Sequence, residues 1–185
     1  MTGGPSLDAL AFRPATVADA GALAALMAEA VGTYRSFAPP GWEPLRAEAI
    51  EENLSARLGR PTVWCLLAEE RSRVAGYVSL LPAADARRPV ADPRLAHFWM
   101  LFVRAPWWGT GLAQRLHGDA VAEATERGFT AMRLFTPAEQ ARARRFYERE
   151  RWSAAAEPFD DDDVGLRMVE YRRTLPPRGP GRERP

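Results

Sequence analysis

One stretch of the sequence, residues 95–120, restricts the possible folds more than any other. It runs from an apolar segment typical of a buried strand, through Pro106 and two tryptophans, to the turn Gly109-Thr110-Gly111, and then becomes amphipathic. Glycine lets backbone N–H groups approach a ligand closely, and the first turn of a helix presents unpaired N–H donors with partial positive charge. A strand, a glycine turn and a helix in this order predict an anion-binding turn.

Length and composition narrow the class of protein. The chain has 185 residues, 46% of them hydrophobic, which fits one globular domain. The 25 basic residues, all arginine, nearly cancel 24 acidic ones, so we expect no nucleic-acid or membrane partner. With one cysteine no intrachain disulfide can form, and with no secretory leader and no long apolar run the expected location is cytoplasmic.

Hydrophobic periodicity and turn signals give the expected elements. Residues 1–10 and the Pro/Gly/Arg-rich residues 175–185 are expected to be flexible, which leaves a domain at residues 11–174. Strands are predicted at residues 12–14, 62–70, 73–81, 95–103, 130–136, 153–159 and 164–173, and helices at 17–31, 44–58, 109–127 and 137–152. Thr16 with Asp19, and Thr136 with Pro137 and Glu139, form the capping patterns of the first and last helices. This order predicts an α/β fold with a mixed sheet covered by helices on both faces.

Residue types separate the classes of phosphate-binding turn. A P-loop needs a lysine after its second glycine, and the chain has no lysine. A dinucleotide fingerprint needs a third glycine where Gln114 stands, and it follows the first strand of its domain, so a nucleotide-dependent oxidoreductase is a weak alternative. Two histidines and one cysteine offer no metal-ligand cluster, and Cys65, inside an apolar run, is most simply a core residue.

Two segments resemble motifs of the GCN5-related N-acetyltransferase (GNAT) superfamily. The segment "LFVRAPWWGTGLAQRL" is similar to its L-x-V strand and [RQ]-x-x-G-x-[GA] turn, and "QARARRFYERERW" is similar to its N-x-x-A-x-x-x-Y-x-x-x-G-F helix. The resemblance covers residues 12–173 and implies a GNAT-like, mostly antiparallel central sheet. The sequence departs from the motifs at Trp108, where the family has Arg or Gln, and at Gln140, where it has Asn. Arg104 or Arg115 could supply the charge that Trp108 lacks.

The resemblance implies acetyl-CoA as co-substrate, with no metal. Backbone donors of the turn and helix would bind the pyrophosphate, and the preceding strand would pair with the pantetheine arm like an added strand. The implied cofactor-binding residues are Leu101, Phe102, Val103, Trp108, Gly109, Thr110, Gly111, Leu112, Ala113 and Gln140.

Direct transfer of an acetyl group to an amine needs one base and one acid. His97 stands where many family members have Glu or His, and we expect it on the same strand face as Trp99, Leu101 and Val103. Tyr147 occupies the tyrosine of the helical motif and is the candidate acid for the departing thiolate. The competing interpretations are a hydrogen-bonded core histidine and a core aromatic. His117 is expected to be a surface or partly buried residue, without a catalytic role.

The resemblance places the amine acceptor opposite the cofactor, near Tyr34, Phe37, Trp42 and Trp99. The acidic residues 160–163 form either a solvated turn or a rim suited to a cationic amine. The predicted function is an acetyl-CoA-dependent N-acetyltransferase for a small-molecule or peptide amine, with a homodimer possible. An acyl-CoA-binding sensor without turnover is the main alternative.

Overall fold

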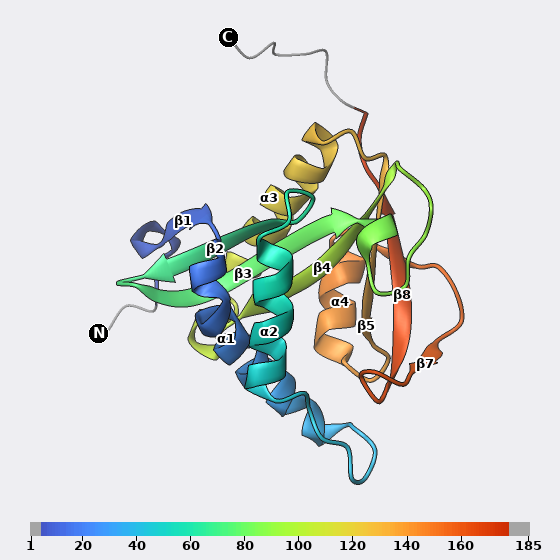
Figure 1. The fold of residues 1–185 in the computed structure, drawn as a ribbon, viewed down its shortest axis with the longest axis horizontal. Coiled ribbons are helices and arrows are strands. Elements are labelled where there is room, and N and C mark those ends of the chain that lie inside the picture. The colour runs from blue at the N-terminus through green and yellow to red at the C-terminus, as the bar shows by residue number, and fades with distance from the viewer. Residues whose placement is uncertain (1–4, 178–185) are drawn as a thin grey trace.

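The chain forms an open sheet of eight strands, in a computed structural model that describes residues 5–177 (Figure 1). The strands are β1 (Ala11–Pro14), β2 (Trp64–Glu70), β3 (Arg73–Pro82), β4 (Leu95–Val103), β5 (Ala131–Pro137), β6 (Ser153–Ala154), β7 (Phe159–Asp161) and β8 (Leu166–Thr174). Their order is β1-β2-β3-β4-β5-β8-β6, and β7 also pairs with β8. Only the β4–β5 pair is parallel, which confirms the predicted mixed, mostly antiparallel sheet.

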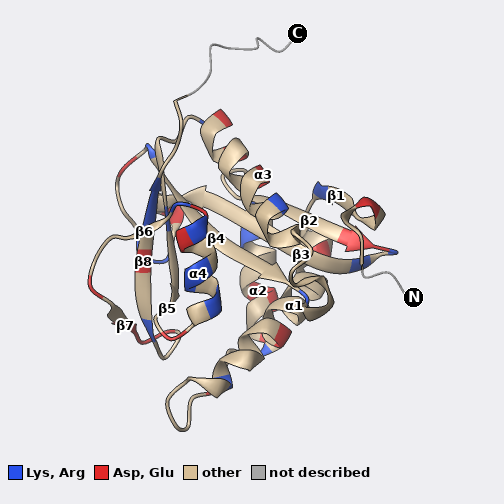
Figure 2. Ribbon diagram, turned by 180° about the vertical axis from the view of Figure 1, so that it is seen from behind, with Lys and Arg blue, Asp and Glu red and all other residues tan. Residues whose placement is uncertain are grey.

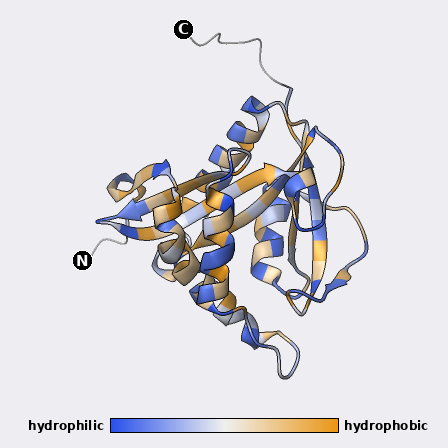
Figure 3. Ribbon diagram, in the orientation of Figure 1, coloured by the Kyte–Doolittle hydropathy of each residue, from blue (hydrophilic) through white to orange (hydrophobic). Residues whose placement is uncertain are grey.

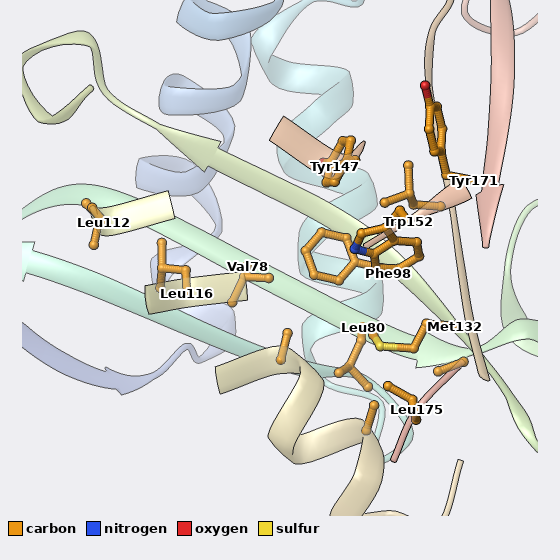
Figure 4. Packing of buried hydrophobic residues seen from close by; sticks show 14 of the residues in the cluster. Val78, Leu80, Phe98, Leu112, Leu116, Met132, Tyr147, Trp152, Tyr171 and Leu175 are labelled. Atoms are coloured by element: carbon orange, nitrogen blue, oxygen red, sulfur yellow. The ribbon is translucent and has the colours of Figure 1, made fainter. Parts of the chain in front are cut away.

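Helices cover both faces of the sheet, as predicted. They are α1 (Ala20–Gly32), α2 (Ala47–Leu58), α3 (Leu112–Glu126) and α4 (Ala141–Arg149). Helices α1 and α2 lie over the face seen in Figure 1, and α3 and α4 lie over the other face, seen in Figure 2. Each face has its own core, and the central strands that separate the two cores carry long hydrophobic stretches (Figure 3). In the core beneath α3 and α4, Leu116 lies beside Val78, while Phe98 meets Tyr147 and Trp152 (Figure 4).

The parallel strands β4 and β5 separate soon after they begin. Their register covers only Leu95, Ala96 and His97 of β4, opposite residues 131–133 of β5, although β4 continues to Val103. On its other side β4 stays paired with β3 as far as Val103. The later part of β4 therefore has one edge without a strand partner. Such an edge offers backbone donors and acceptors to an extended ligand.

A bulge in β4 corrects one prediction about side-chain direction. Met100 pairs with Ser79 and Phe98 pairs with Leu80, so Trp99 is an extra residue opposite β3. Because a bulge shifts the alternation of side chains by one, Trp99, Met100 and Phe102 pack on the α1/α2 side, and Leu101 and Val103 pack on the α3/α4 side. The prediction that Leu101 and Val103 share a face with Trp99 and His97 is therefore wrong.

The last helix begins later than its capping pattern predicts. Thr136 and Pro137 belong to β5, where they pair with Val169 and Met168 of β8. Helix α4 begins at Ala141, with Gln140 in the capping position. Pairing with the long strand β8 thus outweighs a local helix signal, a common result when tertiary contacts oppose local propensity.

Smaller differences concern element ends. Helix α2 begins at Ala47, not near residue 44, and α3 begins at Leu112 because Gly111 adopts a left-handed conformation. The single strand predicted at residues 153–159 is split into β6 and β7. Near the termini, Leu7 packs against the core and Leu175 is buried in it. Residues 1–4 and 178–185, which belong to the two predicted flexible ends, lie outside the described residues.

Candidate active site

A cleft of about 570 Å³ lies where β4 ends, beside the glycine turn and α4. Of the residues predicted to bind the cofactor, eight line it: Leu101, Phe102, Val103, Trp108, Gly109, Gly111, Ala113 and Gln140. The other two are Thr110, whose hydroxyl donates to the Trp107 carbonyl at 2.8 Å, and Leu112, which is fully buried in the core. Tyr147 also lines this cleft. The two segments that resemble GNAT motifs thus lie around one cleft, which we call the cofactor cleft after the predicted role of its residues.

The glycine turn presents unpaired backbone donors. Gly109 and Gly111 have φ values of 80° and 93°, a region that residues with a side chain rarely adopt. The first turn of α3 is closed by a hydrogen bond from the Arg115 backbone N–H to the Gly111 carbonyl, at 3.0 Å. Within residues 5–177, the N–H groups of Gly109, Gly111 and Ala113 donate to no other protein group. Together with the helix dipole, they form a local environment suited to a phosphate.

Arginines of α4 add positive charge to the same cleft. Arg142, Arg145 and Arg149 line it, and the Arg142 guanidinium stacks 3.5 Å from the centroid of the Trp108 ring. Trp108 is 46% exposed, and its Nε1 donates to the Val103 carbonyl at 2.7 Å. Trp108, which stands where the GNAT motif has Arg or Gln, therefore stacks with Arg142 of α4. The sequence pattern alone did not reveal this contact.

The arginines suggested as replacements have other partners. Arg104 pairs with Glu29 and donates to the Val74 carbonyl at 2.7 Å. Arg115 pairs with Asp119 at 2.9 Å. Neither of the two lines the cleft.

Tyr147 lies at the inner wall of the cleft. Its ring packs edge-on against Phe98, Phe146 and Trp152, with centroids 5.4–6.2 Å apart, and the residue is 9% exposed (Figure 4). Its hydroxyl makes no hydrogen bond to another residue in the described part of the chain. Burial raises the pKa of this phenol well above its usual range, so it stays protonated at neutral pH. A protonated hydroxyl without a protein partner can donate to a ligand.

A second cavity, of about 380 Å³, lies on the α1/α2 side of β4. Its walls include Trp42 and Trp99, two of the predicted acceptor residues, and we call it the acceptor-side cavity after that prediction. Tyr34 and Phe102 line this cavity and the cofactor cleft alike, so they stand where the two spaces meet. Phe37, predicted to bind the acceptor, lines the cleft and does not line this cavity.

Aromatic contacts hold the acceptor-side loop in place. Tyr34 lies 5.2 Å from Phe37 and 6.5 Å from Trp42, between ring centroids. Trp42 Nε1 donates to the Val164 carbonyl at 2.8 Å, which ties this loop to the turn before β8. Burial raises the pKa of Tyr34 to about 12, with the neighbouring Gln140 side chain acting in the opposite direction.

His97 lines the acceptor-side cavity and does not line the cofactor cleft. It is 6% exposed, its ring lies 5.2 Å from that of Phe135, and its Nδ1 has no hydrogen-bond partner. Burial, and then the charges of Arg133, Arg57 and Arg87, lower its pKa to about 3. The imidazole is therefore neutral at pH 7, but it is a weak base while these arginines surround it.

His117 is fully buried, where a surface or partly buried residue was expected. It is 2% exposed and accepts a hydrogen bond from Trp152 Nε1 at 2.9 Å. Burial, and then the Arg173 charge, lower its pKa to about 4, so it stays neutral beside Glu150 at pH 7. Its role in the described fold is structural.

The two buried histidines predict a loss of stability in mild acid. Their pKa values of about 3 and 4 lie below the ordinary 6.5. As the pH falls below 6.5, the two histidines therefore bind protons in the unfolded chain and stay neutral in the folded chain. We expect the free energy of unfolding to decrease between pH 7 and pH 5. Below pH 6.5, each histidine should contribute about 1 kcal/mol per pH unit to this decrease. Urea unfolding at both pH values measures this. His117→Gln keeps an acceptor for Trp152 and should remove about half of the slope; an unchanged slope would contradict the assignment.

Two of the four aspartates of the acidic turn pair with an arginine. Asp161 is 3% exposed in its side chain and pairs with Arg87, and Asp163 pairs with the same arginine at 2.6 Å. Asp163 lines the acceptor-side cavity. The sequence suggested either a solvated turn or an acidic rim. The exposed Asp160 and Asp162 fit the solvated turn, whereas Asp161 and Asp163 pair with an arginine from the loop before β4.

Comparison with known proteins defines the class. The sequence model of the acetyltransferase (GNAT) family matches residues 25–151, more than half of the chain. The chain therefore belongs to the GNAT acetyltransferase family. No curated protein shows a significant sequence match.

Solved structures share the fold. Three of them are the PaiA N-acetyltransferase of Thermoplasma acidophilum with coenzyme A, the yncA protein of Salmonella typhimurium with acetyl-CoA, and the ribosomal-protein-alanine N-acetyltransferase of Brucella melitensis. Their TM-scores are 0.67, 0.66 and 0.67, at 15%, 20% and 22% identity. The alignments cover 90%, 91% and 89% of this chain and 99%, 95% and 99% of theirs. Within residues 5–177, no helix has the length and apolarity needed to span a membrane.

Proposed function

We propose that the protein transfers an acetyl group from acetyl-CoA directly to an amine. The observation that carries this proposal is the meeting of two spaces at Tyr34 and Phe102, one with anion-binding features and the other with aromatic walls. Amine acceptors and acetyl-CoA can then approach the gap between β4 and β5 from opposite sides.

The unpaired groups of the cleft fit acetyl-CoA. Backbone donors at Gly109, Gly111 and Ala113 suit the pyrophosphate, with Arg142 beside them to add charge. The unpartnered edge of β4 after His97 suits the amide groups of the pantetheine arm. Acetyl-CoA supplies the activated thioester; the protein supplies its orientation and the proton transfers.

His97 and Tyr147 are proposed as base and acid. The imidazole, neutral at pH 7, would accept the proton that the attacking amine loses, directly or through water, once a bound acceptor offsets the arginine charges that help to lower its pKa. The Tyr147 hydroxyl, held protonated by burial, would give its proton to the sulfur as the bond from sulfur to the acetyl carbon breaks. A direct route is favoured because Cys65, the only thiol, is buried, and burial raises its pKa to about 12.

A thiol-release screen tests the proposed function. The protein with acetyl-CoA is offered small amines, amino acids, polyamines, aminoglycosides and peptides, and free coenzyme A is measured. Release that depends on one class of amine, with the acetylated amine found by mass spectrometry, supports an enzyme. Tight binding of acetyl-CoA without amine-dependent release in any mixture would favour the alternative of a sensor.

Trp42→Ala should separate the two sides of the site. The substitution removes an aromatic wall of the acceptor-side cavity, and losing part of this buried contact, worth about 1.5 kcal/mol, should raise the acceptor KM roughly tenfold. Acetyl-CoA affinity, measured by calorimetry, should stay within about twofold. Trp108→Ala, a tryptophan on the cofactor side, should give the reverse pattern. If Trp42→Ala weakened acetyl-CoA and spared the acceptor, the two sides would be assigned wrongly.

A further inference from the structure

One cation on the wall of the acceptor-side cavity lacks an ionic partner. Four charged side chains line this cavity: Glu43, Arg57, Arg87 and Asp163. Glu43 pairs with Arg35, and Arg87 pairs with Asp161 and Asp163. Within residues 5–177, no carboxylate lies within ion-pair distance of Arg57.

Arg57 is held in position although it is not paired. It stands in the last turn of α2, half-buried, with its guanidinium 5.1 Å from the centroid of the Trp99 ring. One of its N–H groups donates to the Asp85 backbone carbonyl at 3.2 Å. The Asp85 carboxylate acts on it only at longer range, and burial and Arg60 lower the pKa of Arg57. A fixed, partly desolvated guanidinium with free donors is an anchor for a carboxylate.

The surroundings of His97 indicate the same excess of positive charge. Its Nδ1 is buried without a hydrogen-bond partner, which is costly unless a ligand or water completes it. Arg133, directly opposite His97 in the β4–β5 register, is 2% exposed and has an unpartnered Nε. It donates to the Ala83 and Arg88 carbonyls and lies over the Phe135 ring, and the Glu170 carboxylate, which pairs with Arg172, acts on it only at longer range. This end of the cavity therefore combines unmatched positive charge with an unsatisfied polar atom.

We propose that the amine acceptor also carries a carboxylate, which Arg57 binds. The inference rests on the proposed function and names the substrate class of the same site. One unpaired arginine on the wall matches one negative charge, and its planar fork fits the two oxygens of a carboxylate. Besides Arg57, the paired charges, Asn53 and His97, the remaining lining residues are aromatic or aliphatic, and the cavity is at the small end of the range for ligand sites. The acceptor is thus a small amino acid-like compound with an apolar side chain.

Matched pairs of compounds test this substrate class. Apolar α-, β- and γ-amino acids are each compared with their carboxamide and with the amine lacking the carboxyl group. Binding to the protein saturated with coenzyme A is measured by calorimetry, and kcat/KM by thiol release. Arg57→Gln removes the charge, and Arg60→Gln, at an exposed arginine one turn further along the chain that does not line the cavity, is the matched control.

For at least one apolar amino acid, the carboxylate form should bind at least about tenfold more tightly than its carboxamide. Arg57→Gln should abolish this ratio while acetyl-CoA still binds, and Arg60→Gln should leave it unchanged. A carboxamide or plain amine that binds as well as the acid, or a preference that survives Arg57→Gln, would overturn the inference. So would the absence of binding by every amino acid; turnover with other amines would then leave the proposed function standing, and no turnover at all would remove both.

Discussion

Gly111→Asp is expected to lower acetyl-CoA affinity by at least about 10²-fold, because a carboxylate within a few ångströms of a phosphate costs several kcal/mol at a protein surface. Gly111 lines the cofactor cleft at a φ of 93°, and its N–H is one of the unpaired donors of the turn. Calorimetric titration with acetyl-CoA measures the effect.

Gly111→Asn provides the matched control for this prediction. Asparagine has nearly the same shape as aspartate, and both tolerate the left-handed conformation better than other residues with a side chain. An added Cβ would meet only the Leu7 side chain at 3.7 Å and that of Gln114 at 3.9 Å, which are ordinary contacts. Gly111→Asn should therefore fold and lose much less affinity than Gly111→Asp. Equal affinities for both variants would show that the turn does not bind the phosphates.

Tyr147→Phe is expected to lower kcat by about 10² or more, because it removes the proposed proton donor and keeps the ring. The hydroxyl makes no hydrogen bond within the described protein, so its loss should change the free energy of unfolding and acetyl-CoA affinity little. Single-turnover kinetics with saturating acceptor isolate the chemical step from product release.

Tyr171→Phe is the control for the loss of a phenol. Its ring lies 6.3 Å from that of Tyr147, but its hydroxyl accepts from Arg144 at 3.0 Å and donates to Glu148 at 2.8 Å. This variant should lose stability, by about 1 kcal/mol or somewhat more, and keep its kcat. A normal single-turnover rate in Tyr147→Phe would remove this tyrosine from the chemistry.

The sequence was informative wherever local chemistry decides the structure. The glycine turn and the helix after it are fixed by residues within a few positions of each other, and the predicted anion-binding turn lies beside the predicted strand and Tyr147. The capping pair of Thr16 and Asp19 forms as predicted. Such features need few tertiary contacts, which is why pattern reasoning finds them.

Features that depend on distant segments could not be predicted. Residues 98–103 are all apolar, so no alternation of polar and apolar residues there reveals the bulge that moves Leu101 and Val103 to the other face. The pairing of Arg87 with Asp161 joins residues 74 positions apart, so the sequence could not show that part of the acidic turn binds an arginine. The unpaired state of Arg57 likewise becomes visible only once the partners of its neighbours are known.

Direct transfer from acetyl-CoA to an amine can be tested by following a labelled acetyl group in a single turnover. With protein in excess over acetyl-CoA and an acceptor found in the screen, the reaction is quenched at successive times and the protein and small molecules are analysed by mass spectrometry. With direct transfer, the label passes to the amine at the rate at which free coenzyme A appears, with no acetylated protein at any time. Label that first accumulates on the protein and then moves to the amine would contradict it.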